Sequence, residues 1–160
     1  MLPPILDVIL SLQFIIPALC IGYLFGSIPS GFLLTKAFGL GDIRNIGSGN
    51  IGATNALRTG NKVLAFLTLL CDMLKGTVPV IVVYSIFPDQ LIFILYITAL
   101  GALIGHIFPI WLKFKGGKGV ATTIGLMLAT SFYSGVLVCL TWLLVAFISK
   151  KSSFLINSTP

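Results

Sequence analysis

The sequence predicts an all-α, polytopic membrane helical bundle with short or re-entrant helices and glycine-rich cytoplasmic loops. Of the 160 residues, 57% are hydrophobic and 9% are charged, whereas about a quarter of a soluble domain is usually charged. The apolar residues form runs near the roughly 20 residues that a membrane-spanning helix needs. Short basic segments lie between these runs and give a formal net charge of +6. We therefore expect one integral membrane domain over residues 1–160.

A membrane location also explains why basic residues outnumber acidic ones. In a soluble protein, ten Lys and Arg against four Asp and Glu would indicate a nucleic-acid ligand. Here the positive charges cluster in short loops, so the positive-inside rule and anionic ligands explain them better, and we expect no nucleic-acid partner. The three cysteines and the single histidine lack metal-ligand spacing. Neither a metal nor another cofactor is expected.

The first span is predicted over residues 5–25 and contains Pro17, a kink that neighbouring helices can absorb. The segment GSIPSG, residues 26–31, then breaks the helix. Residues 32–40 are apolar but too few to cross a bilayer. They predict a short or re-entrant helix.

Two further spans are predicted over residues 63–87 and 91–112, joined by a tight turn at residues 88–90. The first carries Asp72 and Lys75 at i, i+3 spacing on one helical face. An intramembrane charge is usually functional or paired, and the spacing leaves open both a functional role and a self-neutralising ion pair. The small residues Gly101 and Gly105 form a face that allows close helix packing.

Residues 120–150 form an apolar run that is long for one helix, which would have to tilt strongly. The segment SFYSG, residues 131–135, offers a break. Charge asymmetry favours the break, because two crossings place Lys150 and Lys151 on the same side as the other basic clusters.

The polar loop (residues 42–62, DIRNIGSGNIGATNALRTGNK) is the longest polar stretch. Its residues 47–50, Gly-Ser-Gly-Asn, can adopt left-handed backbone angles and turn their amides towards one anion. Arg58 adds a planar fork that suits phosphate or carboxylate. A solvated connection between two membrane helices is the alternative, although such connections rarely need so many donors.

The glycine-rich loop (residues 113–119, KFKGGKG) precedes a helix predicted to open at Val120. It lacks the spacing and the preceding strand of a Walker A loop. We expect a glycine turn whose free amides and helix dipole attract an anion, with contact to anionic lipid as the alternative. If residues 91–112 return across the bilayer, both loops lie on one face, which suits a ligand with a phosphate in water and a tail in lipid. For His106, the single histidine, a satisfied core residue and a catalytic role both stay open.

Four segments in order resemble the bacterial acyl-phosphate-dependent glycerol-3-phosphate acyltransferase family: GSIPSG (26–31), DIRNIGSGNIGATNALR (42–58), DMLKG (72–76) and GHIFPIWLKFKGGKGVAT (105–122). The resemblance implies a small integral inner-membrane enzyme without a soluble catalytic domain. It implies acyl transfer from acyl phosphate to the 1-hydroxyl of sn-glycerol 3-phosphate. The products are lysophosphatidic acid and inorganic phosphate, in the first step of phospholipid synthesis.

The resemblance also implies roles for individual residues. Ser48, Arg58 and His106 are the candidate catalytic residues. The residues expected to bind substrate come from both loops: Asn50, Asn55, Lys115, Gly116, Gly117, Lys118 and Gly119. Acyl phosphate has a good leaving group, so the site must position two anions and neutralise charge more than generate a strong nucleophile. The expected partners are acyl phosphate, glycerol 3-phosphate and membrane lipid, with the active site facing the cytoplasm.

Two other functions stay open. A membrane transporter of an organic anion would use the same basic loops and the broken helix near Pro29. An inactive remnant is the third class, because family members continue with another apolar segment and a cytoplasmic stretch that carries a functional His, Asn and Glu. Residues 149–160, SKKSSFLINSTP, resemble only the start of that segment. We therefore expect a C-terminally truncated member with little or no acyltransferase activity.

Overall fold

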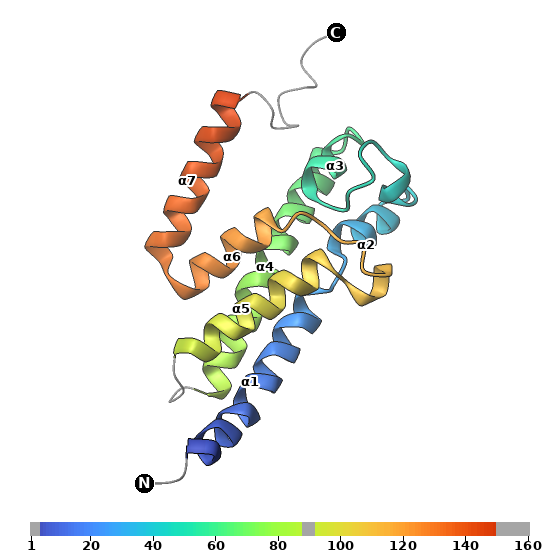
Figure 1. The fold of residues 1–160 in the computed structure, drawn as a ribbon. Coiled ribbons are helices and arrows are strands. Elements are labelled where there is room, and N and C mark those ends of the chain that lie inside the picture. Colours follow the sequence, from blue (N-terminus) through green and yellow to red (C-terminus); the bar gives the residue numbers. More distant parts are fainter. Residues whose placement is uncertain (1–3, 88–91, 150–160) are drawn as a thin grey trace.

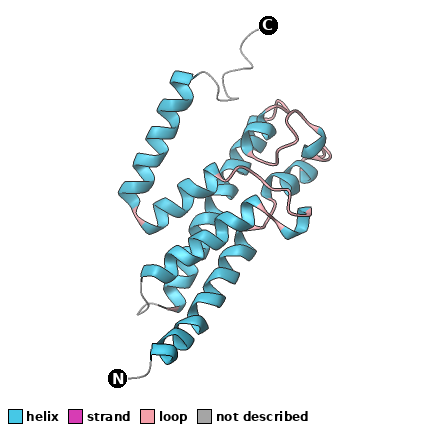
Figure 2. Cartoon of the chain, in the orientation of Figure 1, coloured by secondary structure: helices cyan, strands magenta, loops and turns pink. Residues whose placement is uncertain are grey.

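The protein is a bundle of helices of very different lengths. The computed structural model describes residues 4–87 and 92–149, and every regular element within these ranges is helical (Figures 1 and 2). The long helices are α1 (Pro4–Gly26), α4 (Lys62–Ile86), α5 (Ile92–Ile107) and α7 (Phe132–Ser149). The short elements are α2 (Ser30–Ala37), η1 (Ile43–Asn45), α3 (Ala53–Leu57), η2 (Ile110–Leu112) and α6 (Val120–Thr130). The predicted all-α fold is confirmed.

Within the described residues, three stretches are long and apolar enough to cross a membrane: Leu12–Ala37, Lys62–Ile86 and Ile92–Leu112. The second and third agree with the spans expected over residues 63–87 and 91–112, whereas the first runs past the expected end at residue 25 into the short helix that follows. Pro17 lies inside α1, which continues to Gly26. The predicted break follows, and α2 then begins at Ser30.

α1 and α5 pack closely because both present glycines at the contact. A Cβ on Gly105 would collide with the backbone carbonyl oxygen of Tyr23, and one on Gly101 would collide with that of Leu19. From the other side, Gly22 and Gly26 are equally tight against the α5 backbone. The predicted small-residue face is confirmed, and its partner is α1.

α5 is shorter than the predicted helix over residues 91–112. It ends at Ile107, and the turn η2 follows after Pro109. Proline has no N–H to donate and disfavours helical angles in the residue before it, so the chain leaves the helix at this position. The hydroxyl of Tyr23 in α1 donates to the carbonyl oxygen of Phe108 at 3.0 Å. This hydrogen bond stabilises the chain where it leaves α5.

The predicted break in the last apolar run is confirmed, because α6 ends at Thr130 and α7 begins at Phe132. The 11 residues of α6 rise about 16 Å, short of the roughly 30 Å hydrocarbon core. α7 reverses direction, and Figure 1 shows its C-terminal end at the same end of the molecule as α3. The predicted turn at residues 88–90 and the pair Lys150 and Lys151 lie outside the described residues.

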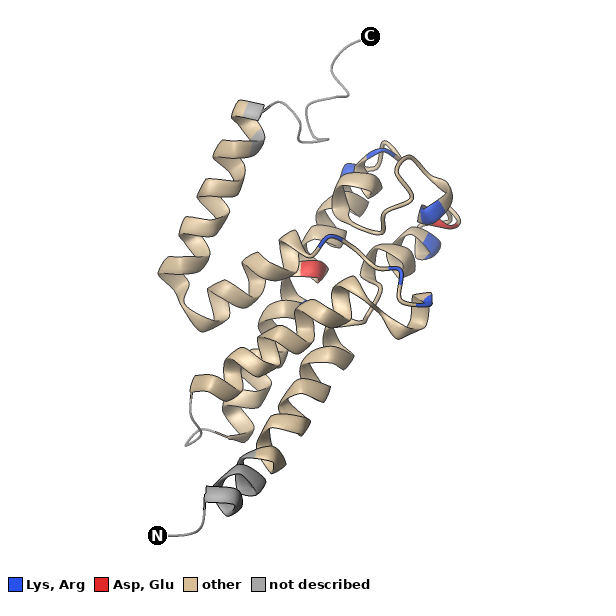
Figure 3. Ribbon diagram, in the orientation of Figure 1, with Lys and Arg blue, Asp and Glu red and all other residues tan. Residues whose placement is uncertain are grey.

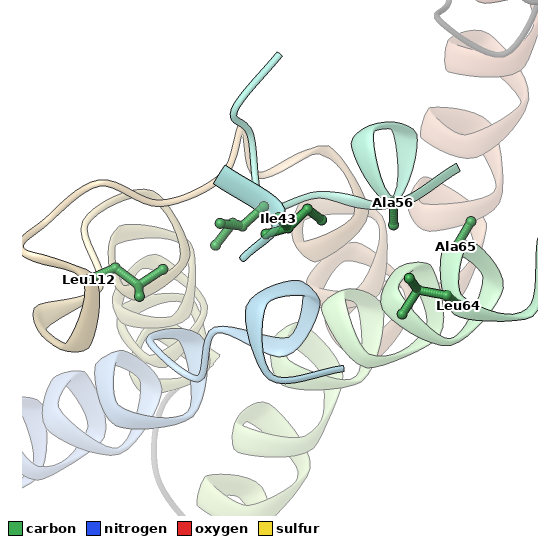
Figure 4. Packing of buried hydrophobic residues seen from close by; sticks show 6 residues of the cluster. Ile43, Ala56, Leu64, Ala65 and Leu112 are labelled. Carbon is green, nitrogen blue, oxygen red and sulfur yellow. The ribbon is translucent and has the colours of Figure 1, made fainter. Parts of the chain in front are cut away.

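A small apolar core joins the two basic loops. Ile43 and Ala56 of the polar loop pack in one buried cluster with Leu64 and Ala65 of α4 and with Leu112 of η2 (Figure 4). Leu112 immediately precedes the glycine-rich loop. The cluster therefore places both loops at one end of the bundle, where most of the basic residues gather (Figure 3).

Candidate functional site

The polar loop is built around the side chain of Asn55, which is 2% exposed. Its Oδ1 accepts hydrogen bonds from the amide and the hydroxyl of Ser48, at 3.0 and 3.3 Å. Its Nδ2 donates to the carbonyl oxygens of Ile43, Ile46 and Asn50, at 3.1, 2.8 and 2.8 Å. These contacts lie within the loop, so Asn55 places Ser48. A role for Asn55 in substrate binding stays a prediction and would act through Ser48.

The glycines of this loop have the expected backbone angles, but their amides do not all point outward. Gly47 and Gly49 have φ values of 52° and 70°, in the left-handed region that glycine tolerates. The amide of Ser48 donates to Asn55, and that of Gly49 donates to the carbonyl oxygen of Ile46 at 3.0 Å. The predicted convergence of these amides on an anion is therefore wrong for two of them, because folding the loop uses both.

Arg58 carries a charge that no described residue neutralises. Its side chain is exposed and lies across Gly47, where an added Cβ would collide with its Cδ at 2.6 Å. Arg44, by contrast, forms an ion pair with Asp42 at 2.6 Å, and this hydrogen-bonded pairing lowers the pKa of Asp42 to about 2. Of these two arginines, Arg58 is the one whose guanidinium stays available to an anion.

The glycine-rich loop folds back onto the end of α5. The amide of Gly116 donates to the backbone carbonyl oxygen of Ile107 at 3.0 Å, and the amide of Gly117 donates to the backbone carbonyl oxygen of His106 at 3.1 Å. Gly119 has a φ of 81° and opens α6, with no side-chain cap on the first turn of that helix. The predicted glycine turn is confirmed. The amides of Gly116 and Gly117 are used inside the protein, so the amides for an anion lie at the start of α6.

The lysines of this loop are exposed to the surroundings: Lys113, Lys115 and Lys118. Lys113 and Phe114 both have positive φ values, which turn the chain sharply after η2. A phosphate at the start of α6 would meet uncapped helix amides and lysine charge together.

His106 lies beneath the glycine-rich loop and is 3% exposed. Its Nδ1 is 3.0 Å from the hydroxyl of Thr122 in α6. Its Nε2 faces the loop, because a Cβ on Gly117 would collide with that atom. The histidine is thus a buried residue that packs beneath the glycine-rich loop. Its catalytic role stays a prediction.

Asp72 and Lys75, in the apolar middle of α4, form an ion pair. Lys75 Nζ is 2.8 Å from Asp72 Oδ1, and both side chains are about as buried as His106. Ser30 donates to the same carboxylate oxygen at 2.5 Å, and Lys75 also donates to the carbonyl oxygen of Ile28 at 3.0 Å. The ion pair that the spacing allowed is therefore formed, and it ties α4 to the break between α1 and α2.

Comparison with known proteins identifies the family. The glycerol-3-phosphate acyltransferase family matches residues 16–156 of this chain. The chain belongs to this family. A glycerol-3-phosphate acyltransferase of Pelagibacter ubique (strain HTCC1062) is 52% identical over 142 residues, which cover 89% of this chain and 72% of the relative. Another, from Bradyrhizobium diazoefficiens, is 55% identical over 137 residues, covering 85% of this chain and 67% of the relative.

Solved acyltransferase structures share the fold. A crystal structure of PlsY (YgiH), an integral membrane glycerol 3-phosphate acyltransferase in its glycerol 3-phosphate form, matches with a TM-score of 0.74 and 37% identity. It covers 83% of this chain, which spans 66% of the solved one. The lysophosphatidic acid form matches with a TM-score of 0.72 and 35% identity. The predicted acyltransferase family and its membrane fold are confirmed.

The family's two basic motifs meet at one end of this molecule, but their parts differ in accessibility. Ser48, Arg58, Lys115 and Lys118 are exposed, whereas Asn55 and His106 are buried. Sequence reasoning overlooked the hydroxyls of Ser30 and Thr122, which complete the buried polar contacts. The charged pair in an apolar helix signalled that partners were needed, but nothing in its spacing identified them.

Proposed function

We propose that this chain transfers an acyl group from acyl phosphate to the 1-hydroxyl of glycerol 3-phosphate. The observation that carries the proposal is the shared apolar cluster that sets the polar loop beside the glycine-rich loop. Ile43 of the first loop and Leu112 at the start of the second belong to this cluster. Two basic, donor-rich loops at one end of a membrane bundle suit two phosphate-bearing substrates, one of which carries an apolar chain.

The reaction needs positioning and charge neutralisation. The hydroxyl oxygen attacks the acyl carbon, the bond from that carbon to the phosphate oxygen breaks, and phosphate leaves with the electron pair. The proton of the hydroxyl is lost as the ester forms, and phosphate can accept it. Arg58 and the lysines of the glycine-rich loop would hold the two phosphates and offset the charge that grows on the leaving group. Ser48, held by Asn55, would donate or accept a hydrogen bond at the reacting groups.

We place this site at the cytoplasmic face of a bacterial inner membrane. The basic residues gather at one end of the bundle (Figure 3), and cytoplasmic loops carry the excess of Lys and Arg in membrane proteins. Both phosphorylated substrates would then reach the site from the cytoplasm. The acyl chain would remain in the bilayer beside the helices.

The test is a product assay on the purified chain in detergent and in sealed vesicles. Acyl transfer predicts lysophosphatidic acid and inorganic phosphate from palmitoyl phosphate only when glycerol 3-phosphate is present. Passage of glycerol 3-phosphate across the vesicle membrane without covalent change would favour the transporter instead. Absence of both product and passage would overturn the proposal in favour of an inactive chain.

A further inference from the structure

A buried polar network lies directly under the glycine-rich loop, outside the residues assigned to substrate. Its side chains come from four helices that are separate in sequence. They are Ser30 of α2, Asp72 and Lys75 of α4, His106 of α5 and Thr122 of α6. Each is at most 6% exposed. A polar network in an apolar bundle is stable only when its members satisfy one another.

The charges within the network are balanced. Asp72 receives the ammonium of Lys75 and the hydroxyl of Ser30, and Lys75 also reaches the carbonyl oxygen of Ile28. His106 Nδ1 lies 3.9 Å from Asp72 Oδ1, too far for a hydrogen bond but close enough to feel the carboxylate. The ion pair therefore places a fixed carboxylate near Nδ1 of the imidazole.

Thr122 contacts the same ring nitrogen more closely than Asp72 does. Its hydroxyl is 3.0 Å from His106 Nδ1, and its side chain is fully buried. With Nδ1 engaged, the ring can present only Nε2 to the loop, and Nε2 is the atom that a Cβ on Gly117 would strike. The backbone adds a second link, because the Gly117 amide donates to the His106 carbonyl oxygen at 3.1 Å. His106 thus supports the loop through its side chain and its backbone together.

We propose that Thr122 is a positioning residue that acts through His106 to hold the glycine-rich loop in its anion-binding form. The proposal rests on the proposed function, in which this loop takes the phosphate of glycerol 3-phosphate. A ring held at Nδ1 keeps Nε2 at the base of the loop, as partners on one imidazole nitrogen orient the other in metal sites. Without the Thr122 hydroxyl the ring can rotate, and the loop then loses its contact with Nε2 at Gly117.

The first experiment compares two substitutions at one position. Thr122→Val keeps the shape of the side chain and removes the hydroxyl, whereas Thr122→Ser keeps the hydroxyl. We expect Thr122→Val to raise the KM for glycerol 3-phosphate about three- to tenfold, the effect of one lost hydrogen bond, with kcat within about twofold. Thr122→Ser should restore the KM to near the wild-type value. Removing Asp72 is avoided, because it would leave Lys75 as an uncompensated buried charge.

Thr98→Val is the matched control. Thr98 is equally buried and lies on α5, as His106 does, but its hydroxyl donates to the carbonyl oxygen of Ile94 in its own helix. This variant measures the general effect of losing a buried threonine hydroxyl. We expect its KM for glycerol 3-phosphate to stay at the wild-type value.

The second experiment observes the imidazole directly. His106 is the single histidine of the chain, so ¹⁵N-histidine labelling gives NMR signals from one ring. We expect Thr122→Val to shift the Nδ1 signal while Thr98→Val leaves it in place. Adding glycerol 3-phosphate to the wild type should shift the Nε2 signal, because that nitrogen faces the loop.

The two measurements separate the network from the function. An Nδ1 signal unchanged by Thr122→Val, or equal KM values for the Val and Ser variants, would overturn the positioning network while turnover continued. The proposed function would instead be refuted if the wild type formed no lysophosphatidic acid and its Nε2 signal did not shift when glycerol 3-phosphate was added. In that case the network would lose its role in substrate binding as well.

Discussion

At the scale of single residues, substitution of Arg58 tests the proposed site most directly. We expect Arg58→Lys to lower kcat/KM at least tenfold in acyl transfer. The substitution keeps the charge but loses the planar fork that binds two phosphate oxygens at once, and a lost charged hydrogen bond corresponds to roughly 1.5–3 kcal/mol. Steady-state kinetics with palmitoyl phosphate and glycerol 3-phosphate measure the change.

Arg44→Lys serves as the comparison for Arg58→Lys. Arg44 is an arginine of the same loop whose guanidinium is already paired with Asp42. An exposed pair of this kind contributes little, so activity should stay within about twofold of the wild type. If Arg58→Lys retained activity within about threefold, Arg58 would supply only a general positive field.

Asn55 is the residue on which the polar loop depends. Asn55→Asp has nearly the same shape but replaces the donor Nδ2 with an acceptor facing three carbonyl oxygens. Losing these bonds, at about 1 kcal/mol each, together with the new repulsion should lower the thermal unfolding temperature of the protein.

Asn50→Asp is the control for that measurement. Asn50 accepts a hydrogen bond from the amide of Gly52 through Oδ1 at 3.0 Å, and aspartate retains an oxygen there. Its unfolding temperature should stay close to that of the wild type. Equal unfolding temperatures for the two variants would contradict the organising role of Asn55.

At the scale of elements, the glycine-rich loop depends on its contact with the end of α5. We expect Gly117→Ala to raise the KM for glycerol 3-phosphate more than it lowers kcat. The added Cβ would push against the His106 ring, displacing the loop from a contact made in ground and transition states alike. A decrease confined to kcat would move this loop from substrate binding to the chemical step.

Gly116→Ala separates loop position from loop folding. Its Cβ would strike the backbone carbonyl oxygens of His106 and Ile107, which cannot rotate away as a side chain can. This variant should therefore reduce the amount of folded protein in the membrane more than Gly117→Ala does, because the Cβ of Gly117→Ala meets only a side-chain ring. Detergent-extracted monodisperse protein, measured by size-exclusion chromatography, compares the two.

At the scale of the whole molecule, the basic end should face the cytoplasm. In a variant whose native cysteines are replaced, Lys115→Cys should resist an impermeant thiol reagent added to intact cells and react after the membrane is opened. Gln90→Cys, in the turn predicted to face outward, should react in intact cells. Labelling of position 115 from outside would reverse the orientation that the positive-inside rule predicts.

The order of elements could be predicted because it rests on local physics. Apolar run length set the three spans, and the glycines and proline of residues 26–31 marked the break before α2. The segment at residues 131–135 marked the break between α6 and α7. The early end of α5 was missed, although Pro109 carried the signal. Ser48, Arg58 and the glycine-rich loop were singled out by motif and resemblance; the family match confirms the resemblance, and the roles of these residues stay predictions.

The contacts between these elements were decided only by the tertiary structure. Sequence spacing showed that Asp72 and Lys75 share a helix face, but not that Ser30 and Thr122 approach from two other helices. It showed donors in the polar loop, but not that Asn55 uses several of them internally. Helix periodicity determines which residues share a face. Which faces meet depends on packing between segments far apart in sequence, here on glycines that let the backbones of α1 and α5 approach closely.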